Sequence, residues 1–401
     1  MPGVTKHIYD HNIRDIISMW NKEVSTIRCI LPIHYGMNDI IEYLKEFYPY
    51  EWQGVEHKYR YYNKKDDFLK KHKGRTRYNM ESPEALLWKV NLVKVIMKNE
   101  YREQYDENYS EEAVEKARKE LYDKREGNIE KIRHKIELAK SKTQQMTPDY
   151  LDQLIGLYER KNTSQKDRMY ILLELKKYYN DKIIQFFFKL NDTELNQQLR
   201  WEAFYHLQSF NFQPRARKQK YMQIRTRNKK RREYLTHVYI KETYTIPLTP
   251  QELEYRIKNS KEQAIKEFDY FISHSSRDKE AVQQLIIEEN RINKNIFCDW
   301  INDVDYLKRH LICEATLKVI EKRLEQSKSL IFVVSETSKQ SVWCKYELNY
   351  FYELNRPIFI ITVQDIEKGV FNLQPLKDMS FVDPNYKQLA LTQGAHIAAS
   401  Q

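Results

Sequence analysis

Short apolar runs alternate with longer amphipathic stretches in the last third of the chain. These runs are rich in β-branched and aromatic residues, and they cover residues 268–273, 295–299, 329–335 and 357–362. Runs of this length and composition are typical of strands that are buried on both faces of a sheet. Because segments of helical length separate the runs, the pattern predicts an α/β domain with a parallel sheet.

The first 250 residues carry helix signals instead. Ser82-Pro83-Glu84 and Thr147-Pro148-Asp149 each combine a capping hydroxyl, a proline at the first helical position and an acid in the first turn. They predict helices of about 20 and about 12 residues. Charges of both signs fill positions 110–142, which is typical of a long solvated helix. Residues 169–190 and 193–207 predict an antiparallel helix pair, so we expect this region to be mostly α-helical.

A third capping pattern marks the joint between the two regions. Thr249-Pro250-Gln251-Glu252 predicts one helix that runs from Pro250 to about Lys266. The chain is then expected to divide into four parts: a helical region at 1–248, a connecting helix at 249–266, the sheet domain at 267–384, and an unassigned tail or final helix at 385–401.

The positive charge of the chain belongs to its helical region. The net charge is +11, yet residues 261–401 hold 18 Lys and Arg against 20 Asp and Glu, which leaves 50 against 37 for residues 1–260. We therefore expect the N-terminal region to be a basic regulatory or sensor region.

The densest part of this charge is a basic cluster without any acid. Its ten members are Arg215, Arg217, Lys218, Lys220, Arg225, Arg227, Lys229, Lys230, Arg231 and Arg232. Such a cluster can bind nucleic-acid phosphates, and nearby tyrosines could stack on bases. A solvated helix face or linker explains it equally well, because no nucleic-acid-binding motif accompanies it.

Cysteine spacing and hydropathy indicate the compartment. Cys29, Cys298, Cys313 and Cys344 lie far apart and form no CxxC pair, which favours a reducing compartment and neither a disulfide framework nor a metal site. No apolar stretch reaches the ~20 residues that span a bilayer. The sequence therefore predicts a cytoplasmic protein without membrane contact.

Two motifs of the sheet domain carry a family resemblance. The segment 268–278 reads FDYFISHSSRD, and the segment 341–348 reads SVWCKYEL. Together with the order of strands and helices between them, these motifs resemble a Toll/interleukin-1 receptor (TIR) domain. The resemblance implies a flavodoxin-like parallel sheet over about residues 267–384. It also implies self-association through TIR domains and an isolated domain from about Glu267 that folds but has low activity.

Many bacterial and plant TIR domains cleave NAD⁺ between nicotinamide and ribose, using the glutamate of a Ser-x-Trp-Cys-x-x-Glu-Leu pattern. Glu347 matches that glutamate, so the resemblance implies that Glu347 is catalytic. Its expected substrate-binding neighbours are Trp343, Ser273, His274, Arg277, Asp299, Trp300 and Tyr346. Trp343 lies four residues before Glu347, which places both on one helical face.

One carboxylate is chemically adequate for this reaction. Nicotinamide departs neutral from a pyridinium cation, so it needs no acid to protonate it, unlike the leaving oxygen of an ordinary glycoside. NAD⁺ is then a substrate, and no cofactor is expected.

No glycine lies between Gly156 and Gly369, which excludes a GxGxxG fingerprint or P-loop there. The loop 301–307 also lacks the Pro-Gly pair of many relatives, which puts loop-mediated assembly in doubt.

The leading interpretation is an NAD⁺ nucleosidase that yields nicotinamide and ADP-ribose or a cyclic isomer. Such fusions resemble bacterial anti-phage effectors, in which an N-terminal region would respond to nucleic acid or another phage-derived trigger. A TIR scaffold without activity is the alternative, although a scaffold has no chemical need for both Trp343 and Glu347. A third possibility is a nucleic-acid-binding protein that acts through the basic cluster.

Overall fold

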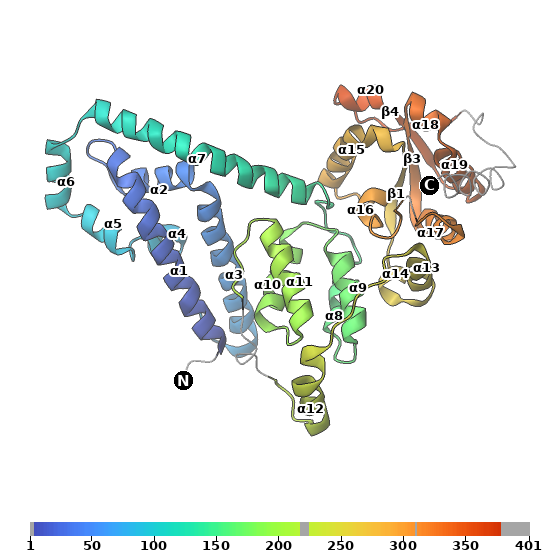
Figure 1. Cartoon of the computed structure of the whole chain (residues 1–401), viewed down its shortest axis with the longest axis horizontal. Coiled ribbons are helices and arrows are strands. Elements are labelled where there is room, and N and C mark those ends of the chain that lie inside the picture. Colours follow the sequence, from blue (N-terminus) through green and yellow to red (C-terminus); the bar gives the residue numbers. More distant parts are fainter. Residues whose placement is uncertain (1–3, 217–223, 309–310, 378–401) are drawn as a thin grey trace. The chain divides into compact units, whose positions relative to one another are not determined.

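The computed structural model describes residues 4–216, 224–308 and 311–377 (Figure 1). The chain forms two compact units. The first unit contains Met1–Leu138, Phe188–Leu195 and Ala203–Arg232, and the second contains Ala139–Phe187, Asn196–Glu202 and Glu233–Gln401. The helices α7 (Glu111–Lys140), α10 (Asp181–Thr193), α11 (Gln197–Ser209) and α12 (Lys229–His237) each have residues in both units.

Helices build the first unit. They are α1 (Val4–Ile27), α2 (Met37–Phe47), α3 (Pro49–Lys73), α4 (Pro83–Leu87), α5 (Asn91–Ile96), α6 (Asn99–Glu107) and most of α7. The indoles of Trp20 and Trp52 meet in its core, with ring centroids 5.5 Å apart. Gly74 ends α3 in the left-handed conformation, with φ of 66°. Asp66 then accepts hydrogen bonds from the backbone N–H groups that follow the turn.

The N-terminal region is helical, as predicted, but its helices are shorter. The single helix expected after Ser82 is three helices, α4 to α6, because Val90 is extended between α4 and α5 and Lys98 is extended between α5 and α6. Val90 is fully buried, and its packing overrides the helical pattern of this segment. The segment 169–190 likewise divides into α9 (Gln165–Leu175) and α10. The long charged helix is confirmed as α7.

The second unit contains a five-stranded sheet in the order β2-β1-β3-β4-β5. The strands are β1 (Phe268–Ser273), β2 (Ile296–Phe297), β3 (Ser327–Val334), β4 (Ile358–Thr362) and β5 (Gln374–Pro375). The first four pair in parallel, and β5 is antiparallel to β4. This confirms the predicted α/β class. The strand β2 is shorter than expected because Asp299 already begins a helix.

Helices cover both faces of this sheet (Figure 1). They are α15 (Lys279–Arg291), α16 (Asp299–Asn302), α17 (Glu314–Glu325), α18 (Glu336–Gln340), α19 (Val342–Glu353) and α20 (Val363–Glu367). Successive strand residues face opposite sides. Ile272 therefore joins the core formed with α15, while Phe271 joins the core formed with α17 and α19.

The second unit also includes helices that precede the sheet: α8 (Leu151–Glu159), α9, α13 (Pro250–Asn259) and α14 (Lys261–Ala264). The Thr249 side chain caps α13 as expected, accepting from the N–H of Glu252. The expected single helix to Lys266 is interrupted, however, because Ser260 is extended and separates α13 from α14. The segment directly before β1 is thus the short helix α14 and not the end of one continuous helix.

Candidate active site

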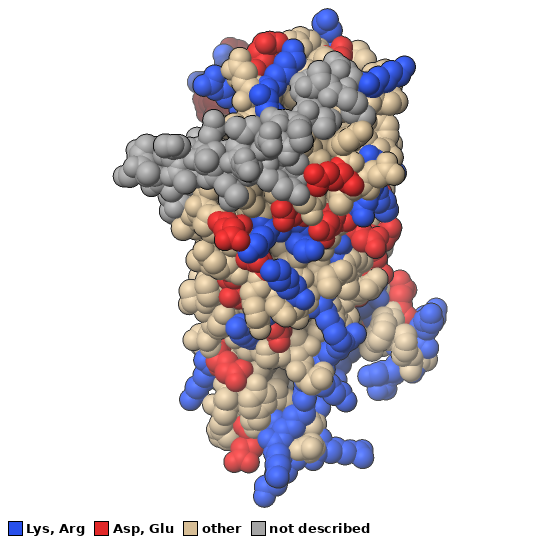
Figure 2. Space-filling model, turned by 90° about the vertical axis from the view of Figure 1, so that its right-hand side faces the viewer, with Lys and Arg blue, Asp and Glu red and all other residues tan. Residues whose placement is uncertain are grey.

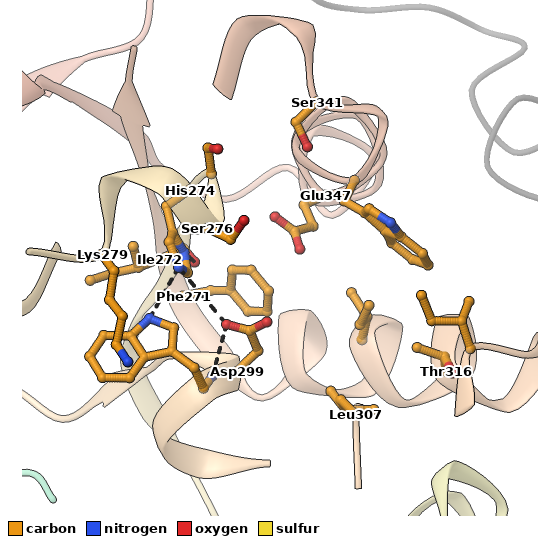
Figure 3. A pocket seen from close by; sticks show the side chains of 15 residues that line it. Phe271, Ile272, His274, Ser276, Lys279, Asp299, Leu307, Thr316, Ser341 and Glu347 are labelled. Carbon is orange, nitrogen blue, oxygen red and sulfur yellow. Dashed lines mark hydrogen bonds and ion pairs between the residues drawn. The ribbon is translucent and has the colours of Figure 1, made fainter. Parts of the chain in front are cut away.

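A cavity of about 380 Å³ lies at the carboxyl ends of β1 and β2 (Figure 3). Parallel sheets commonly bind ligands at this edge. Its walls come from the end of β1, the starts of α15 and α16, the loop after α16, and the helices α17 and α19. The lining residues are Phe271, Ile272, His274, Ser275, Ser276, Lys279, Asp299, Trp300, Leu307, Ile312, Thr316, Ile320, Ser341, Trp343 and Glu347. We call this cavity the Glu347 pocket.

The turn after β1 forms one wall of the Glu347 pocket. The Ser275 hydroxyl accepts a hydrogen bond from the N–H of Arg277, and Asp278 accepts one from the Ser335 hydroxyl at 2.6 Å. These bonds hold a short 3₁₀ turn that leads directly into α15, whose first residue is Lys279. The amino end of a 13-residue helix and a lysine thus face the same pocket, which favours an anionic group there.

The helix α19 supplies the carboxylate and an aromatic ring. Ser341 caps this helix by accepting from the N–H of Cys344. Trp343 and Glu347 follow at a spacing of four, and both side chains line the pocket, as predicted. In Figure 3 the Glu347 carboxylate points into the cavity, toward the wall that carries Ser276 and Asp299.

The environment of Glu347 disfavours its charged form. Enclosure by protein atoms raises the pKa of its carboxyl to about 8, and the negative charge of Asp299 adds to the rise. The nearby hydroxyl of the buried Ser273 opposes the rise of this pKa. The side chain is partly buried, so a cationic neighbour stabilises its carboxylate more than it would an exposed one, because less water screens the attraction.

Three other residues predicted for the site, His274, Asp299 and Trp300, form one cluster opposite Glu347. The Trp300 indole N–H donates to Nε2 of His274 at 3.1 Å, and Nδ1 of His274 lies 3.3 Å from the Ile272 carbonyl oxygen. An indole nitrogen only donates, so Nε2 holds the lone pair and Nδ1 carries the proton. Nε2 also lies 4.0 Å from Asp299. The ammonium group of Lys279 lies 4.9 Å from the centre of a Trp300 ring.

The structure separates the other predicted site residues from the pocket. Ser273 is fully buried beneath it, beside Glu347 and Cys344. Arg277 is exposed and does not line it. Tyr346 faces α17, where its hydroxyl donates to Glu321 at 2.5 Å. Tyr346 follows Trp343 by three positions and so lies on the same general side of α19. Its ring nevertheless packs against Leu317.

Sequence reasoning missed Lys279 and the apolar wall. Lys279 could have been found, because it directly follows the motif at 268–278. The wall of Leu307, Ile312, Thr316 and Ile320 had no such signal. Its members come from a loop and a neighbouring helix that only the packing of α17 brings to the carboxyl ends of the strands.

Three side chains could in principle share a cation. Possible ligand atoms of His274, Cys298 and Asp299 lie within 4.8 Å of one another. Nε2 of His274 already accepts the Trp300 hydrogen bond, and burial raises the pKa of the Cys298 thiol well above its ordinary value. Metal binding would have to break that bond and ionise that thiol, so this cluster fits a cation poorly.

The predicted basic cluster lies in the first unit. Arg217, Lys218 and Lys220 are outside the described residues. Of the others, Arg215 forms an ion pair with Asp15 at 3.3 Å, and Lys229 to Arg232 open α12. Figure 2 shows lysine and arginine side chains crowded at the lower end of the face that it draws.

Comparisons with known proteins agree with this architecture. Residues 271–391 match the TIR domain family model. The chain is 33% identical over 374 residues to a Cytobacillus dafuensis protein provisionally named cyclic ADP-D-ribose synthase TIR2, covering 93% of this chain and 95% of that protein. It is 32% identical over 112 residues to a Bacillus cereus (strain MSX-D12) protein provisionally named 3′ cyclic ADP-D-ribose synthase ThsB′, covering 26% of this chain and 58% of that protein.

A more distant match is human Toll-like receptor 2, at 32% identity over 106 residues, which are 25% of this chain and 13% of the receptor. No solved structure gives a significant match. Across the described part of the chain, no helix is long and apolar enough to cross a membrane.

Proposed function

We propose that this chain, which belongs to the TIR-domain family of the Cytobacillus dafuensis protein, cleaves NAD⁺ between nicotinamide and ribose. The products would be nicotinamide and ADP-ribose or a cyclic ADP-ribose isomer. The observation that carries this proposal is the enclosed Glu347 carboxylate beside Trp343, in a pocket whose opposite wall carries Lys279.

The pocket suits each part of such a substrate. The bond between ribose C1′ and the nicotinamide nitrogen breaks with its electron pair going to the nitrogen, which leaves a neutral ring. Positive charge then develops on the sugar, and the Glu347 carboxylate stabilises it. The Trp343 indole offers a flat surface to a ring of the substrate. Lys279 and the amino end of α15 would bind the diphosphate.

Attack on C1′ completes the reaction. Water as nucleophile gives ADP-ribose, whereas a nucleophilic atom elsewhere in the same ADP-ribose gives a cyclic isomer. In either case the nucleophile gives any proton it carries to solvent water as its bond to C1′ forms. NAD⁺ is the substrate, so we propose no bound cofactor.

Incubation of the purified chain with NAD⁺ tests the proposal. We expect nicotinamide to appear together with ADP-ribose or with a cyclic ADP-ribose isomer, whose mass is that of ADP-ribose less one water. Liquid chromatography with mass spectrometry separates these products. A folded chain that releases no nicotinamide under any condition would favour the scaffold alternative.

The rate should depend on pH through Glu347. Only the ionised carboxylate stabilises the sugar cation, so we expect kcat/KM to rise with pH through a midpoint of about 8. Binding of the pyridinium cation favours the carboxylate, and the midpoint for kcat should therefore lie lower. Initial rates between about pH 6 and about pH 10 measure both profiles. A flat kcat/KM over this range would contradict the prediction.

Trp343 should contribute through its ring. We expect Trp343→Ala to raise KM for NAD⁺ about tenfold and Trp343→Phe to raise it much less, because phenylalanine keeps an aromatic surface. Thermal unfolding of both variants is the control, since Trp343 also packs against the apolar cores. If both variants unfold equally early, the ring serves packing and the assignment fails.

We further propose that the chain is a cytoplasmic anti-phage effector, which depletes NAD⁺ or produces a signal when its N-terminal region meets a trigger. TIR domains that associate with one another would assemble the active form. The bacterial relatives and the fusion of a helical region to the TIR domain support this proposal. Phage challenge of cells with the wild-type chain or a Glu347→Gln chain would test it.

Nucleic acid is a candidate trigger because of the run from Lys229 to Arg232 on α12. Each phosphate contact releases counterions, so binding should weaken steeply with salt. Replacing these four residues by glutamine should reduce the slope of log K against log salt by up to about 4. Fluorescence anisotropy with labelled DNA and RNA measures the slope, and an unchanged slope would exclude this run as the binding site.

A further inference from the structure

Five charged side chains form a buried network in the second unit. They are Glu174 of α9, Lys177 in the turn directly after this helix, Lys266 before β1, Asp303 after α16 and Arg323 of α17. Each side chain is at most 9% exposed. Burying charges is costly, and apolar residues of similar size often stabilise a protein as well or better. Stability alone therefore does not account for this network.

The contacts of the network run from α9 to the segment after α16. The Glu174 carboxylate accepts hydrogen bonds from Lys177 at 2.9 Å and from Lys266 at 2.8 Å. Lys177 also forms an ion pair with Asp303 at 3.5 Å. Asp303 in turn accepts two hydrogen bonds from the Arg323 guanidinium, at 2.7 Å and 3.2 Å.

Asp303 and Arg323 hold the apolar wall of the Glu347 pocket. The backbone carbonyl of Asp303 accepts hydrogen bonds from the N–H groups of Tyr306 and Leu307, and the Leu307 side chain lines the pocket. Arg323 belongs to α17, the helix that supplies Thr316 and Ile320 to the same wall. The pair between Asp303 and Arg323 thus fixes the loop relative to the helix.

Apolar contacts also connect α9 with the loop after α16 and with α17. Tyr306 and Val319 form a buried cluster with residues of α13, and Leu173 of α9 and Leu307 pack against it. The helix α9 therefore meets the pocket wall through two adjacent kinds of contact. One is apolar through Leu173, and the other is ionic through Glu174, which holds Lys177 in the turn after the helix and so reaches Asp303.

The charges of the network depend on one another. Burial alone would raise the pKa values of Glu174 and Asp303, yet the surrounding cations hold both below their ordinary values. Burial, and then the charge of Arg323, lower the pKa of Lys266 to about 7. Three cationic groups face two carboxylates, so removing one member leaves its partners unbalanced in a site that water does not screen.

We propose that Glu174 and Lys177 are positioning residues for the Glu347 pocket: through Asp303 and Arg323 they set the wall of Leu307, Thr316 and Ile320. This inference rests on the proposed function for its effect on catalysis. Neither residue lines the pocket, so a shift of α9 would alter substrate binding without any contact between α9 and the substrate. A helix outside the TIR motifs would then adjust the active site.

The test uses full-length variants of Glu174 and Lys177 with a matched control. Lys177→Met removes the ionic link, and Lys177→Arg preserves its charge. Glu174→Gln is a milder change in case Lys177→Met does not fold. The control is Lys176→Met, because Lys176 is the adjacent residue and pairs instead with Glu202, outside the network.

We expect Lys177→Met and Glu174→Gln to raise KM for NAD⁺ about tenfold with a smaller change in kcat, because the wall binds substrate while Glu347 is unchanged. Lys177→Arg should restore most of the affinity, and Lys176→Met should resemble the wild type. Equal KM values for Lys177→Met, Glu174→Gln and the control would overturn the inference.

Hydrogen–deuterium exchange separates this inference from the proposed function. In Lys177→Met, or in Glu174→Gln, peptides that cover residues 299–308 and 314–325 should exchange faster than in the wild type and in Lys176→Met. Unchanged exchange overturns the inference even if the enzyme is active. Faster exchange in a chain that never cleaves NAD⁺ supports the positioning of the wall and rejects the proposed function.

Discussion

Glu347→Gln is expected to lower nicotinamide release by about a hundred-fold to a thousand-fold. Glutamine keeps the shape of the side chain but removes the negative charge that stabilises the sugar cation, and losses of 10² to 10³ are typical for one electrostatic contact. The residual rate would come from binding by the remaining pocket. Single-turnover release of nicotinamide at saturating NAD⁺ measures the loss.

The same substitution should stabilise the protein in alkaline solution. The folded pKa of Glu347 lies above the ordinary value of 4.5, so the contribution of this group to stability is present below pH 4.5 and is lost as the pH rises through about 8. Above that pH the wild type holds an enclosed carboxylate, and Glu347→Gln replaces it with a neutral amide. We expect a higher melting temperature for the variant at about pH 9 and a smaller difference at about pH 6.

A second glutamate of α19 gives the matched control. Glu353 is exposed at the end of the same helix and does not line the pocket. Glu353→Gln should keep the wild-type rate. If Glu347→Gln kept that rate in a folded protein, Glu347 would have no part in the reaction.

Truncation at Glu267 is expected to prevent stable folding, which changes the expectation from the sequence that a domain beginning there folds alone. The structure places essential partners of the sheet upstream. The Gln144 side chain bonds both the N–H and the C=O of Ile296, and so covers the edge strand β2. The hydroxyls of Tyr150 and Tyr178 bond the amide of Asn295, just before that strand.

Removal of these partners leaves buried polar groups unsatisfied, at about 1–3 kcal/mol each. Arg323 and Asp303 would also lose Lys177 and Glu174 from their network. Because a domain is stable by only about 5–15 kcal/mol, several such losses are enough to unfold it. We therefore expect a chain of residues 139–401 to fold and one of residues 267–401 to remain unfolded or aggregate.

Circular dichroism and thermal unfolding of the two truncated chains measure this difference. The 139–401 chain should show a cooperative transition, and the 267–401 chain should show none. A cooperative transition in the shorter chain at a similar temperature would mean that the upstream contacts contribute little to its stability.

The β-strands and the residues around Glu347 could be predicted because their signals are local. An apolar run of strand length is buried wherever it pairs, and the alternation of Phe271 and Ile272 between two cores follows from the geometry of a strand. The spacing of Trp343 and Glu347 likewise places both side chains on one side of α19. These features depend on neighbours within a few residues.

Tertiary structure alone decided the extent of the unit around the sheet, the direction of several polar side chains and the partners of the buried charges. The sequence suggests a boundary at Glu267, but Gln144, Lys177 and Lys266 lie within the unit that contains the sheet. Tyr346 and Arg277 carry side chains suited to a binding site, yet the packing of α17 and the turn after β1 direct them elsewhere. A buried charge is stable only beside its partners, and those partners lie up to 126 residues apart along the chain, as Lys177 and Asp303 do. Local sequence patterns do not show which of these distant residues meet. Only the folded structure therefore identifies the helices that support the pocket.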